Sequence, residues 1–143
     1  MPPPTPDRPP GTLLTLTLLW CLAGGVAAYW LAAWRGLGVS TASPYLAVAS
    51  VFPPADTAMA ATAALSAELL RRGRPAAVLS GLLTAGALAF LGITDIAINL
   101  RFDVYREARG ARLAWELWVN AFSLWFPVWL AVFCWRHRRG LGA

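Results

Sequence analysis

The sequence predicts an all-α fold, a polytopic membrane protein built as a four-transmembrane-helix bundle in a single domain. Three observations support this prediction. Of the 143 residues, 58% are apolar and only 13% are charged, which is more apolar and less charged than a typical soluble domain. The apolar residues gather in four long windows, and most of the arginines lie between these windows. The chain is too short for two ordinary domains, so we expect one bundle whose main solvent is lipid.

Each window meets or approaches the length of about 20 apolar residues that a helix needs to cross a bilayer. The windows are residues 12–34, 54–70, 76–100 and 113–135. The second is the shortest and is broken at its start by Pro53 and Pro54, since a proline inside a helix removes a backbone hydrogen bond. Residues 45–54, within the stretch SPYLAVASVFPPAD, are therefore a candidate re-entrant or interfacial segment before a kinked second helix.

The residues outside the predicted bundle form the two ends of the chain. Residues 1–11, MPPPTPDRPPG, are rich in proline and lack an apolar period, which predicts a disordered tail. The bundle then occupies residues 12–135, and residues 136–143 form a basic tail. A cleaved signal peptide is the alternative interpretation of the first window. We favour a retained span because the apolar run is long and only Arg8 precedes it, opposed by Asp7.

The net charge of +5 comes from arginine alone, since the sequence contains no lysine. Arginines that cluster between apolar runs fit anionic lipid headgroups better than nucleic acid, so the lipid bilayer is the expected partner. We expect a multi-pass protein of a bacterial inner membrane. With both termini in the cytoplasm, seven arginines lie inside and five outside, as the positive-inside rule favours.

The sequence does not indicate a metal or a cofactor. Cys21 and Cys134 lie within apolar runs without a CxxC motif, so they are expected to be small buried hydrophobic residues. His137 lies in the basic C-terminal tail, where a solvated interfacial side chain is expected.

Five strongly polar side chains interrupt the apolar windows. In an up-and-down bundle, the start of the second helix, the end of the third and the start of the fourth meet at one face of the membrane. The polar residues at these ends are Asp56, Asp95, Asn99, Glu116 and Asn120. A carboxylate that faced lipid there would cost at least about 2.5 kcal/mol, so we expect these side chains to face one another.

Helical spacing places each polar residue on a stripe of small or apolar residues. The stripes are Asp56, Ala60, Ala63 and Ala67; Gly81, Leu88, Gly92, Asp95 and Asn99; and Glu116, Asn120, Ser123 and Pro127. Opposite the last stripe lie Trp115, Trp118, Phe122, Trp125 and Trp129, which we expect to face lipid. The first helix offers Gly24 and Ala28 as a small-residue packing edge.

Each acidic residue also has a purely structural interpretation. Asp95 or Glu116 could form a clamp with Arg35, Arg101 or Arg112 that ties the helix ends together. Asp56 follows two prolines at a helix start, where an aspartate N-cap is the ordinary explanation.

Glu68 lies at the other end of the second helix, four residues before Arg72. An i,i+4 ion pair explains it, and we leave it out of the site.

The runs PPADTAMAATAALSAELLRRGRPAA and GALAFLGITDIAINLRFDVY, followed by a tryptophan- and arginine-rich end, resemble a group of small four-span bacterial membrane proteins. This resemblance covers the second helix to the C-terminus and implies four spans, without implying an activity. The architecture is also similar to that of sterol-isomerase and sigma-2-receptor-like four-helix proteins, which place acids in a membrane cavity.

The leading hypothesis is a ligand-binding site formed by Asp95, Glu116, Asn99, Asn120 and Asp56. It would bind, and in one version transport, a cationic or polar small molecule or a proton-coupled ion. The second hypothesis is an accessory subunit that docks another membrane protein through its tryptophan stripe. The third is a lipid or sterol isomerase with Asp95 or Glu116 as general acid or base. Binding is favoured over catalysis, and a homodimer or a membrane-protein partner stays open.

Overall fold

A computed structural model describes residues 9–35 and 51–139 of the chain. Within these residues, all regular secondary structure is helical. The helices are α1 (Thr12–Trp34), α3 (Phe52–Arg71), α4 (Ala76–Arg101), α5 (Val104–Glu107) and α6 (Gly110–His137). Helices α1, α4 and α6 are long and apolar enough to cross a membrane. The all-helical prediction is thus confirmed for the described residues, and these three helices indicate a membrane protein.

The helix boundaries follow the apolar windows closely. Helix α1 covers the first predicted window residue for residue, while α6 begins at Gly110, ahead of the window predicted at 113. Pro53 and Pro54 lie in the first turn of α3, where a missing N–H costs no helical hydrogen bond. They therefore begin this helix, and α3 has no internal proline to kink it. Of the candidate re-entrant segment, residues 45–50 lie outside the described residues.

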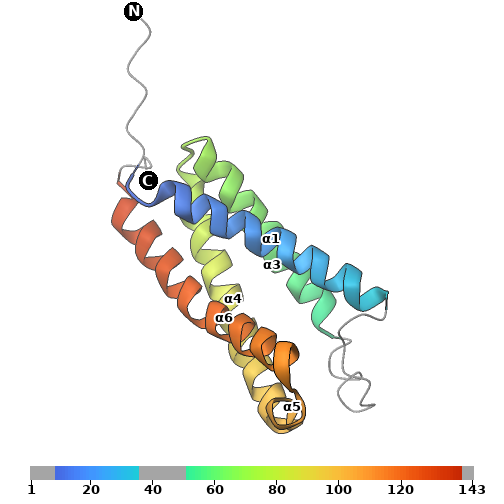
Figure 1. Cartoon of the computed structure of the whole chain (residues 1–143). Coiled ribbons are helices and arrows are strands. Elements are labelled where there is room, and N and C mark those ends of the chain that lie inside the picture. Colours follow the sequence, from blue (N-terminus) through green and yellow to red (C-terminus); the bar gives the residue numbers. More distant parts are fainter. Residues whose placement is uncertain (1–8, 36–50, 140–143) are drawn as a thin grey trace, which may run out of the picture.

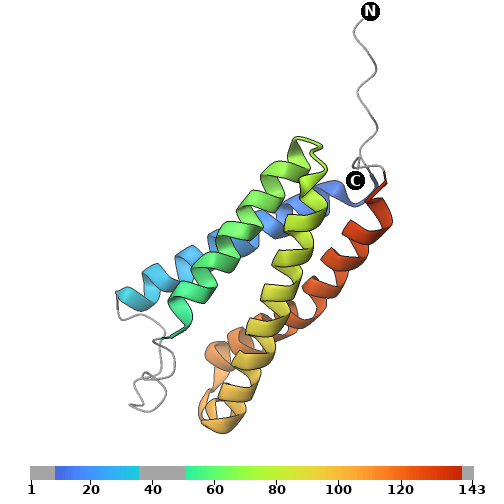
Figure 2. The ribbon, with the colours of Figure 1, turned by 180° about the vertical axis from the view of Figure 1, so that it is seen from behind.

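The long helices form two antiparallel pairs, α1 with α3 and α4 with α6. The two pairs contact each other through α3 and α4. Helix α3 packs against both α1 and α4, and α4 packs against α6 (Figure 1). The start of α1 meets the end of α6, where Trp129 Nε1 donates a 3.2 Å hydrogen bond to Thr15 Oγ1. Towards the opposite end, the α1–α3 pair and the α4–α6 pair diverge, as the view from behind also shows (Figure 2). The predicted polar residues of α3, α4 and α6 all lie towards this divergent end.

Glycine brings α4 and α6 into close contact. A Cβ atom on Gly81 would lie 2.6 Å from Cys134 Sγ, and one on Gly92 would lie 2.6 Å from Ser123 Cβ. Gly81, Gly92 and Ser123 are all buried, as their positions on the predicted inward stripes require. The close approach of the two backbones is possible because neither glycine has a side chain. It sets the distance between the polar residues one turn further along both helices.

The predicted packing edge of α1 is wrong. Gly24 and Ala28 are exposed, and a Cβ on Gly24 would have no neighbour within 4 Å. Helix α1 instead buries Leu16 and Leu19. This helix is apolar on every side, so its sequence gives almost no rotational signal, and only its contact with α3 shows which face is buried. Cys21 is also exposed, contrary to the expectation of burial, whereas Cys134 is buried.

The outer face of α6 carries the predicted aromatic stripe. Trp115, Trp118, Trp125 and Trp129 are all exposed on the surface. Trp118 and Phe122 stack with their ring centroids 5.5 Å apart, and Trp115 stacks on Trp118 at 5.6 Å. The helix therefore presents apolar rings outward and its polar residues towards α4.

Candidate functional site

The candidate site begins in the last two turns of α4. Asp95 and Asn99 lie one turn apart on the face that packs towards α6. Asn99 Nδ2 donates a 3.2 Å hydrogen bond to Asp95 Oδ2. Asn99 is fully buried and Asp95 is half-buried. The i,i+4 spacing seen in the sequence thus becomes a direct contact between the amide and the carboxylate.

Helix α6 adds Glu116 and Asn120 to the same end of the bundle. Glu116 is half-buried and Asn120 is buried. The Asn99 side chain lies within hydrogen-bonding reach of Glu116, and Glu116 lies within electrostatic range of Asp95. Four of the five predicted site residues therefore meet across the α4–α6 interface, and we call this group, with Tyr105 introduced below, the acid–amide cluster.

Tyr105 is the site residue that the sequence analysis missed. It lies on α5, the short helix that joins α4 to α6, and its hydroxyl oxygen accepts a 2.5 Å hydrogen bond from Asn120 Nδ2. Its side chain also lies within reach of Asn99. Burial raises the pKa of the Tyr105 phenol above its ordinary value, and the nearby carboxylates of Asp95 and Glu116 act in the same direction.

Residues 101–112, RFDVYREARGAR, are rich in charged side chains, and the sequence alone predicts a solvated loop or a short surface helix with internal charge pairs. The helix is present, and Arg106 pairs with Asp103 at 3.2 Å. A tyrosine between two polar helix ends was the available signal, because a phenol can reach back to both helices.

Asp56 belongs to the other helix pair. Trp30 Nε1 on α1 donates a 3.0 Å hydrogen bond to Asp56 Oδ2. The N-cap of α3 is Val51, so the N-cap interpretation of Asp56 is wrong. Asp56 nevertheless lies within electrostatic range of Asp95. The structure thus places the fifth predicted residue at the edge of the acid–amide cluster, with a tryptophan as its direct partner.

The arginine clamp, the structural alternative for Asp95 and Glu116, is not formed among the described residues. Within residues 9–35 and 51–139, the ion pairs join Glu68 to Arg71 and Arg72, and Asp103 to Arg106. The predicted pairing of Glu68 with Arg72 is thereby confirmed, at 2.5 Å.

Neither Asp95 nor Glu116 forms an ion pair with any arginine in the described part of the chain, although Arg112 acts on Glu116 at longer range. Arg35, Arg101 and Arg112 are exposed, and an exposed guanidinium group in water keeps its hydration. Among the described residues, the Asn99 amide is the hydrogen-bonding neighbour of both carboxylates.

Two buried acceptor atoms in the cluster have no donor. Asn99 Oδ1 and Asn120 Oδ1 are buried and accept no hydrogen bond from any described residue. A buried carbonyl oxygen without a donor costs about 1–3 kcal/mol, and an apolar environment increases that cost. Chemically, the cluster offers two carboxylates and two amide oxygens as acceptors, which suits a cation or a ligand rich in N–H or O–H groups.

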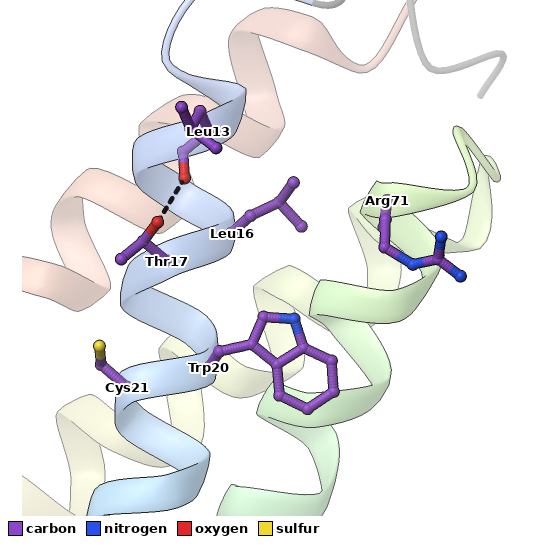
Figure 3. Close-up of a pocket in the computed structure, with 6 residues that line it drawn as sticks. All are labelled: Leu13, Leu16, Thr17, Trp20, Cys21 and Arg71. Carbon is purple, nitrogen blue, oxygen red and sulfur yellow. Dashed lines mark hydrogen bonds between the residues drawn. The ribbon is translucent and has the colours of Figure 1, made fainter.

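Two surface grooves lie at the other end of the bundle and are separate from the acid–amide cluster. One has a volume of about 460 Å³ and lies between the start of α1 and the end of α3 (Figure 3). The other has a volume of about 360 Å³ and lies between the start of α1 and the end of α6. No residue of the acid–amide cluster lines either groove, so the cluster is identified as a candidate site by its side-chain chemistry.

The fold and the site can be compared with known proteins. No family model, curated protein or solved structure matches this chain.

Proposed function

We propose that this chain is a small integral membrane protein whose acid–amide cluster binds a cationic or hydrogen-bond-donating small molecule. The observation that carries the proposal is the pair of buried amide oxygens, Asn99 Oδ1 and Asn120 Oδ1, which accept no hydrogen bond from the described residues. They lie beside two carboxylates that form no ion pair with an arginine in the same part of the chain. An organic ammonium group would supply both the missing charge and the missing donors. Transport of such a ligand, or of a proton-coupled ion, is an extension of the same proposal.

Four membrane spans are part of this proposal, with α3 as the additional one. Helix α3 has 20 residues, which corresponds to about 30 Å of helix and to the thickness of a bilayer core. It packs between α1 and α4, so its neighbours can shield its less apolar surface from lipid. Arg71 ends this helix, and Arg72 and Arg74 follow it, at the same end of the bundle as Arg136. This charge favours that end as the cytoplasmic one of a bacterial inner membrane.

The test compares ligand binding by the wild-type chain and the Asp95→Asn variant in detergent micelles. The probe is a radiolabelled lipophilic primary amine, measured by equilibrium dialysis, with the alcohol of the same chain length as a neutral reference. A hydrogen bond to a charged group contributes about 1.5–3 kcal/mol. We therefore expect the Asp95→Asn variant to bind the amine at least about tenfold more weakly. Its affinity for the alcohol should equal that of the wild type.

The matched control is Asp103→Asn, which makes the same chemical change at the same end of the bundle. Asp103 is exposed and pairs with Arg106, and asparagine tolerates its left-handed backbone, φ 53°. This variant should bind the amine as the wild type does. Equal amine affinity for the wild type and Asp95→Asn would remove the proposal.

The aromatic face of α6 favours a second candidate, an accessory subunit that docks another membrane protein. Trp125 and Trp129 expose 46% and 38% of their surface, and tryptophan is enriched in the energetic centres of interfaces. A pull-down in mild detergent would separate the two candidates. A stoichiometric partner lost with Trp125→Ala plus Trp129→Ala, but kept with Asp95→Asn, supports the accessory role.

A further inference from the structure

The groove between α1 and α3 combines an apolar wall with a cationic end. Five of its six lining residues come from the first three turns of α1, and Arg71 comes from the last turn of α3 (Figure 3). The lining residues are Leu13, Leu16, Thr17, Trp20, Cys21 and Arg71. Trp20 exposes 49% of its surface and Leu13 exposes 77%. This groove therefore lies on the outer surface of a helix long and apolar enough to cross a membrane, where acyl chains would surround it.

Positive charge is concentrated at the same end of the groove. Glu68 shares its carboxylate between Arg71 Nε at 2.7 Å and Arg72 Nε at 2.5 Å. One carboxylate against two guanidinium groups leaves an uncompensated positive charge, and Arg74 follows in the turn that joins α3 to α4. Arg71 and Arg72 expose 55% and 62% of their side chains, so they are accessible to a headgroup.

Thr17 does not supply a strong polar site within the groove. Its hydroxyl donates a 3.0 Å hydrogen bond to the carbonyl oxygen of Leu13 one turn earlier (Figure 3). The wall of α1 is consequently apolar along the groove, and the only formal charge among the lining residues is that of Arg71. An elongated apolar surface that ends at a cation matches a lipid with an acyl chain and a negatively charged headgroup.

We propose that this groove binds an anionic phospholipid, with one acyl chain along Leu16 and Trp20 and its phosphate near Arg71. The proposal is independent of the acid–amide cluster, which lies at the opposite end of the bundle. Because one arginine near a membrane surface contributes about 1 kcal/mol to the attraction of anionic lipid, the preference for an anionic over a zwitterionic lipid should be about fivefold.

Native mass spectrometry of the full chain tests this proposal. The protein is delipidated in detergent and then titrated with palmitoyl-oleoyl phosphatidylglycerol or the matching phosphatidylcholine. We expect about fivefold tighter retention of phosphatidylglycerol by the wild type, and loss of that preference in Arg71→Gln. Arg71→Lys should keep the preference, since it keeps the charge while losing the two-point contact with Glu68.

Two further variants separate the groove from general lipid adhesion. Thr17→Trp fills the groove from an exposed position, so it should weaken retention of both lipids. Arg101→Gln removes an exposed arginine at the end of α4, at the other end of the bundle, and should change neither. Circular dichroism verifies that each variant keeps its helical content.

The outcomes decide the proposal in both directions. Equal retention of the two lipids by the wild type overturns it, as does an anionic preference that persists in Arg71→Gln. Retention of soluble glycerol phosphate equal to that of the lipid would also overturn it, because the acyl chain would then contribute nothing.

Discussion

Replacing Gly92 with alanine should separate α4 from α6 and weaken the bundle. The added Cβ would lie 2.6 Å from Ser123 Cβ and 3.1 Å from the Ser123 carbonyl oxygen, and a backbone oxygen cannot rotate away as a side chain can. Overpacking of this kind costs about 1–3 kcal/mol. The intrinsic helix preference of alanine over glycine, about 1 kcal/mol, offsets part of this cost. We therefore expect a net loss of up to about 2 kcal/mol in the free energy of unfolding, measured by titrating mixed micelles with sodium dodecyl sulfate.

Gly86→Ala is the matched control on the same helix. Gly86 is exposed and has no atom within 4 Å of the added Cβ, so this variant should be stabilised by about 0.5–1 kcal/mol. In a double-mutant cycle, Ser123→Gly should recover part of the stability lost in Gly92→Ala. If Gly92→Ala were as stable as Gly86→Ala, the inferred close contact of the two helices would be wrong. The acid–amide cluster one turn away would then lose its geometric basis.

Three further outcomes follow from the polar contacts. Tyr105→Phe deletes the acceptor for Asn120 Nδ2, so it should cost about 1–3 kcal/mol of unfolding free energy in the same assay; an unchanged value would show that this hydrogen bond does not contribute. In a spectrophotometric titration, the Tyr105 phenolate should form above the ordinary pKa of about 10, since burial raises its pKa. The folded state then holds this proton more tightly than the unfolded state. The associated stability is complete below about pH 10 and is lost as the pH rises through the raised pKa, whereas Tyr105→Phe should lack this component. Trp30→Phe removes the donor to Asp56 and should destabilise by about 1–3 kcal/mol, while Trp34→Phe, at an 85% exposed position, should change nothing.

Much of the candidate site could be predicted from helical phase. The four-residue spacing of Asp95 and Asn99 already placed them on one face, and the same periodicity placed Glu116 and Asn120 together. Helical phase depends on the sequence of one helix alone, so the face on which a residue lies can be predicted without knowing the neighbouring helices. It failed for Gly24 and Ala28, because α1 is apolar all round and its rotation depended on the shape of α3.

The partners of the polar groups could not be predicted in this way. Asp56 pairs with Trp30, which is distant in sequence, and Tyr105 returns to Asn120 through a turn whose path depends on Asp103 in the left-handed region. The alternative of an arginine clamp could not be decided from the sequence, because ion-pair choice depends on where long side chains can reach once the helices have packed.

The sequence by itself determined that the chain is helical and apolar enough for a membrane, and which face of α4 and α6 carries polar groups. These properties depend on composition and on a periodicity of 3.6 residues. Only the tertiary structure decided that the two helix pairs diverge, that α5 contributes a phenol to the cluster, and that two amide oxygens remain without donors. Those outcomes depend on distances between atoms of different helices, which are set by packing.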